Sequence, residues 1–124
     1  MNNRIFISFA IEDEQYRTYL RGQARNAKSP FEFVDMSVKE AWDSSWKTNC
    51  RTRIKGCDGV IVLLSKNIKK ADGALWEIEC AKEENIPIIG VYIHTDDKYF
   101  PDEMYGIKKI TWTWDGIADF INSL

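Results

Sequence analysis

The fold class of this chain is decided by Asp58-Gly59-Val60-Ile61-Val62-Leu63-Leu64-Ser65. The interior of this run is apolar without alternation, which is typical of a strand covered by helices on both faces. A second run, Pro87–Ile93, has the same character, and Arg4–Phe9 is rich in β-branched and aromatic residues. We therefore predict three buried strands that belong to one sheet.

Weaker signals on either side of these runs complete the order of elements. Phe31–Val34 alternates and predicts an edge strand, and Lys109–Trp112 predicts a short last strand. Helices are expected between the strands: from Glu12 to about Asn26, from Ser45 to Gly56, from an N-cap at Asp72 to Glu84, and from a cap at Asp115 through Ser123. Such alternation predicts a single α/β domain over residues 1–124, a doubly wound parallel five-stranded sheet with helices on both faces.

Composition excludes several classes of function. A formal net charge of −2 argues against a nucleic-acid partner held by charge alone. The three cysteines lack CxxC spacing and His94 is the sole histidine, so we expect reduced thiols and no metal site. No signal peptide and no apolar run of about 20 residues is evident, so we expect a cytoplasmic protein without a membrane partner.

A ligand site is expected where the parallel strands end, because doubly wound sheets bind ligands beyond their carboxyl edge. The segments that reach this edge are Ser8–Ala10, Asp35–Ser37, Ser65–Asn67 and the loop before Pro101. Two long loops, Asp35–Ser44 and Lys66–Ala71, are expected at the same edge, and long loops in small domains are often functional.

Glu77 is the candidate acid at this edge. Leu75, Ile78 and Ala81 repeat at helical spacing and are expected to form an apolar stripe that faces the sheet. This spacing places Glu77 beside that stripe, with its side chain directed along the edge of the sheet. Position alone leaves two readings open, a catalytic carboxylate or an acid that only solvates a helix near its start.

Six segments, in order along the chain, resemble one known family. They are Arg4–Phe9, Phe33–Ser37, Trp46-Lys47 with Arg53-Ile54, Asp58–Ser65, Trp76-Glu77-Ile78 and Pro87–Val91. Together they resemble the TIR-like domains of bacteria, in particular the small TIR-like proteins of Thoeris-type antiphage defence, over most of residues 4 to 93.

This resemblance implies a flavodoxin-like fold and, in enzymatic members, cleavage of the nicotinamide–ribose bond of NAD. It implies an NAD glycohydrolase, ADP-ribosyl cyclase or transferase with NAD as substrate and no cofactor. A phage-derived trigger would start the reaction, self-assembly into oligomers would accompany it, and the ADP-ribose-derived product would activate a separate effector protein.

The family's catalytic glutamate matches Glu77, with one departure from the pattern. Many TIR enzymes show Trp-x-x-x-Glu, whereas here Gly73 stands four residues before Glu77. Counting Trp-x-x-Glu from Trp76 would select Glu79 instead. We prefer Glu77 because the run of an aromatic residue, Glu and Ile looks more like this branch of the family, and Glu79 remains the second choice.

The chemistry needs one carboxylate and no histidine. Breaking the nicotinamide–ribose bond builds positive charge on the ribose, which an ionised glutamate can stabilise. Candidates to line the site and bind NAD are Ser8, Phe9, Asp35, Ser37, Trp46 and Trp76, although each also has a plain structural interpretation.

Two rival functions share this fold class. One is a non-catalytic TIR-like signalling adaptor, and the other is a nucleoside deoxyribosyltransferase-like enzyme, which also uses a glutamate. A response-regulator receiver is excluded because Ser65 stands where its phosphate-accepting aspartate would be. P-loop and Rossmann proteins are excluded because the sequence has no glycine-rich phosphate loop.

Overall fold

The strands form one parallel sheet. The computed structural model describes residues 3–27, 31–34 and 44–124. Its strands, given in chain order, are β1 (Asn3–Ser8), β2 (Phe31–Val34), β3 (Gly59–Leu64), β4 (Ile88–Tyr92) and β5 (Lys109–Thr111). They lie in the order β2-β1-β3-β4-β5, and every neighbouring pair is parallel. The predicted five-stranded parallel sheet, with β2 at its edge, is confirmed.

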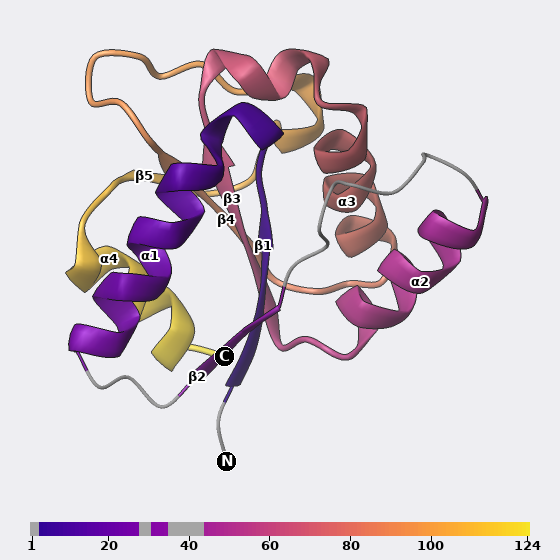
Figure 1. Cartoon of the computed structure of the whole chain (residues 1–124), viewed down its shortest axis with the longest axis horizontal. Coiled ribbons are helices and arrows are strands. Elements are labelled where there is room, and N and C mark those ends of the chain that lie inside the picture. The colour runs from indigo at the N-terminus through magenta and orange to yellow at the C-terminus, as the bar shows by residue number, and fades with distance from the viewer. Residues whose placement is uncertain (1–2, 28–30, 35–43) are drawn as a thin grey trace.

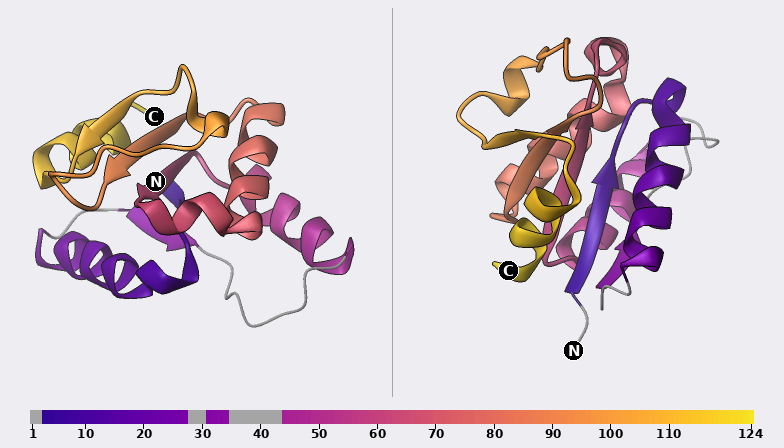
Figure 2. Two further views of the ribbon diagram at one scale, coloured as in Figure 1. Left: turned by 90° about the horizontal axis from the view of Figure 1, so that it is seen from above. Right: turned by 90° about the vertical axis from the view of Figure 1, so that its left-hand side faces the viewer.

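Helices cover both faces of this sheet (Figure 1). The α-helices are α1 (Glu14–Asn26), α2 (Ser44–Lys55), α3 (Asp72–Glu83) and α4 (Trp114–Asn122). Among the described residues, three short 3₁₀ helices lie in the connections: η1 (Ile11–Asp13) between β1 and α1, η2 (Lys66–Lys70) between β3 and α3, and η3 (Asp102–Met104) between β4 and β5. In Figure 1, α1 and α4 lie on one side of the sheet and α2 and α3 on the other; Figure 2 shows α1 and α4 next to each other on their face.

Two apolar cores follow from the alternation of side chains along the buried strands. On β3, Val60, Val62 and Leu64 point toward α2 and α3, whereas Ile61 and Leu63 pack on the side of α1 and α4. Every residue of β3 is buried, as its unbroken apolar run predicts. Both faces therefore need a helical cover, and the fold supplies one to each.

Several local expectations were wrong. Asp72 is the first residue of α3, and the cap position before it is held by Ala71, which makes no side-chain capping hydrogen bond. At α4 the cap is Thr113, whose Oγ1 accepts from the Gly116 N–H at 3.1 Å, while Asp115 lies inside the first turn. A cap side chain must precede the helix to reach its free N–H groups, and both aspartates come too late for that.

The segment expected as a loop over Lys66–Ala71 is wound into η2 instead. The Ser65 hydroxyl starts this turn by accepting from the backbone N–H of Asn67 at 3.1 Å. The segment is therefore a fixed wall at the carboxyl edge of β3. The other segment expected as a long loop, from Asp35 to the start of α2, lies outside the described residues.

Candidate functional site

A cavity of about 290 Å³ opens at the carboxyl edge of the sheet, on the side of α2 and α3. It lies between η1, which follows β1, and the beginning of α3, which follows β3. These two strands are neighbours at the point where the strand order reverses, which is where doubly wound sheets bind their ligands. The residues that line the cavity are Phe9, Ile11, Glu12, Trp46, Lys70, Ala71, Asp72, Gly73, Ala74 and Glu77.

Glu77 lies in the wall of this cavity and is almost fully buried, with 6% of its surface exposed. The buried hydroxyl of Ser8 donates to Glu77 Oε1 at 2.7 Å and lies 3.3 Å from the carbonyl oxygen of Ala74. The thiol of Cys50 lies 3.7 Å from Glu77 Oε2 and donates to it. Each carboxylate oxygen therefore has a buried donor, as a buried charge requires.

The Cys50 thiol stays protonated at neutral pH. Burial is the larger cause that raises the pKa of the Cys50 thiol far above its ordinary value, and the negative charge of Glu77 raises it further. A thiol that keeps its proton can donate it to the carboxylate but is a poor nucleophile. Cys50 is thus a hydrogen-bond donor in this site.

The burial of Glu77 corrects the expected face of α3. The buried residues of α3 are Ala74, Glu77, Ile78, Cys80 and Ala81, while Leu75 is half-buried. Glu77 therefore lies within the buried stripe and not beside it. Of the three residues expected to face the sheet, Ile78 and Ala81 are buried as predicted, and Leu75 is half-buried.

Glu79 points away from the cavity. Half of its side chain is exposed, and its Oε1 lies 3.3 Å from the ammonium group of Lys82 on the same helix. A helix turns about 100° per residue, so two positions separate the two acids by most of a half-turn. Of the two, Glu77 is the one that lines the cavity.

The aromatic candidates divide between the cavity and its support. Phe9 and Trp46 are buried and line the cavity. Trp76 is half-buried and lies edge-on to Trp46, with ring centroids 5.7 Å apart, so it supports Trp46 from behind. Ser8 contacts Glu77 but does not line the cavity, and Asp35 and Ser37 lie outside the described residues.

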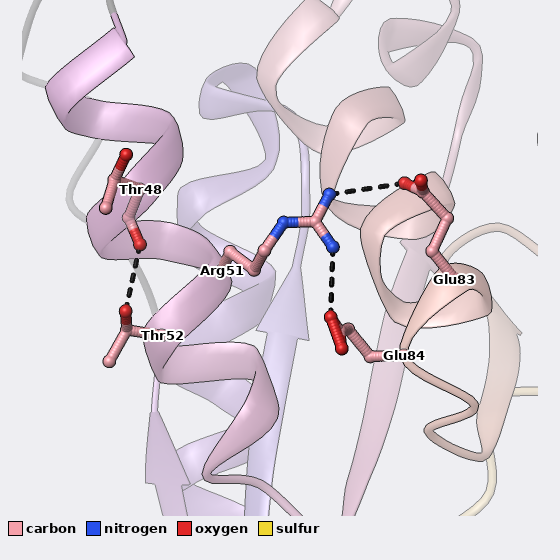
Figure 3. A network of polar contacts seen from close by, with 5 residues as sticks. All are labelled: Thr48, Arg51, Thr52, Glu83 and Glu84. Carbon is pink, nitrogen blue, oxygen red and sulfur yellow. Dashed lines mark hydrogen bonds and ion pairs between the residues drawn. The ribbon is translucent and has the colours of Figure 1, made fainter.

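Arg51 joins helix α2 to the end of α3 (Figure 3). Its Nη1 lies 3.1 Å from Glu84 Oε2, and its Nη2 lies 3.3 Å from Glu83 Oε1. The centre of the guanidinium group also lies 5.5 Å from the centroid of the Trp76 ring. Arg51 thus fixes the helix that carries Trp46 and Cys50 against the helix that carries Glu77.

A buried aspartate joins the two turns that flank the cavity. Asp13, at the end of η1, is 2% exposed. Its carboxylate accepts from the Ser65 hydroxyl and, at 2.9 Å, from the side-chain amide of Asn67 in η2. These bonds hold the Ile11–Glu12 wall at a fixed distance from the start of η2.

Sequence reasoning missed several residues of this site. Cys50 was read only as a reduced thiol, yet it follows Trp46 by four positions and precedes Ile54 by four, so helical spacing places all three on one buried face. Glu12, Lys70 and Asp72 also line the cavity. Glu12 and Lys70 lie in short 3₁₀ turns, which carry no periodic signal, and Asp72 is the first residue of α3.

The arrangement supports charge stabilisation by one carboxylate. Across residues 3–27, 31–34 and 44–124, no group of three or more His, Cys, Asp or Glu side chains is placed to hold a metal ion.

Within the same residues no helix is both long and apolar enough to cross a membrane.

Comparisons with solved structures identify the fold. The TIR domain of the Toll-related receptor TRR-2 from Hydra magnipapillata superposes with a TM-score of 0.71 at 14% identity, covering 95% of this chain and 97% of that one. The 2-deoxyribosyltransferase of Bacillus psychrosaccharolyticus gives 0.66 at 13% identity, with 92% and 89% covered. A prokaryotic SEFIR domain gives 0.58 at 16% identity, with 98% and 89% covered.

These likenesses show the fold alone, because all three identities are low. No curated protein sequence matches the chain. Residues 6–98, most of the chain, match the family described as Thoeris protein ThsB, TIR-like domain, in agreement with the resemblance read from the sequence. The chain therefore belongs to the family of TIR-like domains of the Thoeris protein ThsB.

Proposed function

We propose that this protein cleaves the nicotinamide–ribose bond of NAD and makes an ADP-ribose-derived signalling molecule in antiphage defence. One observation carries the proposal: a buried glutamate, Glu77, lies in the wall of a cavity at the β1/β3 switch point of a chain of the ThsB family. A phage-derived trigger, self-assembly and a separate effector protein belong to the same proposal, as does action in the cytoplasm, where NAD is at hand.

In the proposed reaction, the bond between ribose C1′ and the nicotinamide nitrogen breaks. Its electron pair goes to the ring nitrogen, so that nicotinamide leaves as a neutral molecule. The ribose then carries positive charge, which the Glu77 carboxylate stabilises at close range in a site of low dielectric. Water, or another nucleophile, supplies an electron pair to C1′ and loses its proton, and the identity of that nucleophile sets the product.

The cavity suits one end of the dinucleotide. Its volume of about 290 Å³ is close to the lower limit for small-molecule pockets, roughly 300 Å³. We place the nicotinamide riboside end there, with the rings of Phe9 and Trp46 as its apolar walls. The ammonium group of Lys70 at the rim supplies positive charge for the phosphates.

The proposal is tested by incubating the purified protein with NAD and, separately, with a deoxynucleoside, with and without lysate of phage-infected cells. We expect nicotinamide to be released from NAD and no free base from the deoxynucleoside. Release of free base would favour a deoxyribosyltransferase. Consumption of neither substrate, even with the infected lysate, would refute the proposal and favour a TIR-like adaptor.

A further inference from the structure

We propose that Ser8 and Cys50 are the positioning pair of Glu77: two buried donors that hold its two carboxylate oxygens in the orientation that serves the reaction. The inference rests on the proposed function only in the reaction that the pair is said to serve. The geometry of the pair is independent of that function and can be tested separately.

The two donors approach different oxygens from different elements. Ser8, at the end of β1, donates to Oε1 at 2.7 Å, and Cys50, on α2, donates to Oε2 at 3.7 Å. Both donors are fully buried. The Ser8 proton has a second acceptor in the Ala74 carbonyl at 3.3 Å, but the shorter bond to the charged oxygen is the stronger one. With a donor on each oxygen, the carboxylate is held against rotation about its own axis.

This arrangement makes Glu77 sensitive to the position of α2. Ser8 belongs to a central strand, so its hydroxyl is fixed by the sheet. Cys50 belongs to a helix that is held to α3 by Arg51 and by the edge-on contact of Trp46 with Trp76. The thiol therefore transmits the placement of α2 to the carboxylate.

Cys57 provides a matched control. Like Cys50 it is a buried thiol of the core on the side of α2 and α3, but it lies beyond the end of α2, where the charged groups nearby are Arg4, Asp58 and Glu32. Replacing either cysteine by alanine removes one sulfur from the same core. Only the replacement at Cys50 should reach Glu77.

The direct test is the titration of Glu77 itself, followed by NMR in protein labelled at the glutamate carboxyl carbons, with the signal assigned by its loss in Glu77→Gln. A donor favours the charged carboxylate, so its removal moves the titration midpoint to higher pH. We expect Cys50→Ala and Ser8→Ala to raise the midpoint by about one pH unit each. Cys50→Ser, which keeps a donor, should restore it, and Cys57→Ala should leave it unchanged.

Other ionisable groups near Glu77 are common to all of these variants. Among the described residues they include Cys80 on the same helix and, in the lining of the same cavity, Glu12, Lys70 and Asp72. An unchanged midpoint in Cys50→Ala would overturn the inference, and so would an equal rise in Cys57→Ala. If Cys50→Ala does not fold, the infrared S–H stretching band serves instead, because it reports the hydrogen bond that the Cys50 thiol donates. An identical S–H band in wild type and in Glu77→Gln would overturn the inference.

Turnover of NAD then tests whether the pair serves the reaction. We expect kcat to fall about tenfold in Cys50→Ala, with recovery in Cys50→Ser, because a small misplacement of a catalytic group is costly. A shifted midpoint with an unchanged kcat would overturn the positioning role. A shifted midpoint in a protein that consumes no NAD would leave the hydrogen-bonded pair standing and refute the proposed function.

Discussion

Replacing Arg51 by methionine should loosen helix α2 from helix α3. Methionine keeps an unbranched apolar stem but loses the guanidinium group, its two ion pairs and its contact with the face of Trp76. We expect the substitution to lower the stability of the domain and to disturb the candidate site, because α2 carries Trp46 and Cys50.

The size of the effect follows from the exposure of each partner. The Glu83 side chain is 63% exposed, so that pair contributes at most about 0.5 kcal/mol, and the Glu84 pair, with 23% exposure, about 0.5–1 kcal/mol. The contact with the Trp76 ring adds about 0.5–1 kcal/mol. We expect Arg51→Met to cost about 1.5 kcal/mol, which is a Tm lower by about 6 °C for a domain of this size.

The assay is thermal unfolding at low and at high salt, with Lys55→Met as the matched control. Lys55 ends the same helix, is exposed, and loses the same charge on replacement. Salt screens ion pairs, so the difference between Arg51→Met and wild type should shrink as salt is added.

Equal Tm values for Arg51→Met and wild type at low salt would refute the reasoning. So would a loss in Lys55→Met as large as the loss in Arg51→Met, because the effect would then follow helix charge and not the contacts of Arg51.

Two further predictions concern buried ionisable groups. Asp13→Ala should lower the free energy of unfolding by about 2–3 kcal/mol in a urea titration, because the donors of Ser65 and Asn67 lose a buried acceptor; a cost below about 0.5 kcal/mol would contradict this. Burial raises the pKa of the Cys57 thiol from 9.0 to about 11, so the unfolded chain ionises first and stability should fall as pH rises from 9 to 11. Cys57→Ala should remove up to about 2.7 kcal/mol of that fall, and an unchanged pH dependence in this variant would argue against it.

The sheet could be predicted because its signal is local. Each residue of β3 is apolar, and a strand without a polar face needs cover on both sides, which α1 and α4 supply on one face and α2 and α3 on the other. The helix starts were less predictable, because an aspartate before or inside a first turn gives the same sequence signal. Thr113 and Ala71 hold the cap positions that were assigned to Asp115 and Asp72.

The surroundings of Glu77 could not be predicted from periodicity. A polar residue is normally counted outside the buried stripe of a helix, yet Glu77 lies within it because Ser8 and Cys50 provide donors. Those partners stand 69 and 27 positions away in the chain. Only the folded sheet brings them together. The family resemblance predicts Glu77 as the catalytic acid, and the structure adds the two donors that contact its carboxylate.

The most direct test of the proposed function compares nicotinamide release from NAD by wild type, Glu77→Gln and Glu79→Gln. The two substitutions are the same change, two residues apart on α3, and only the first replaces a residue that lines the cavity. We expect Glu77→Gln to lose at least about a hundredfold in kcat. Glu79→Gln should stay within about twofold of wild type, because its exposed ion pair with Lys82 contributes little. Full turnover in Glu77→Gln, or its loss in Glu79→Gln alone, would contradict the account.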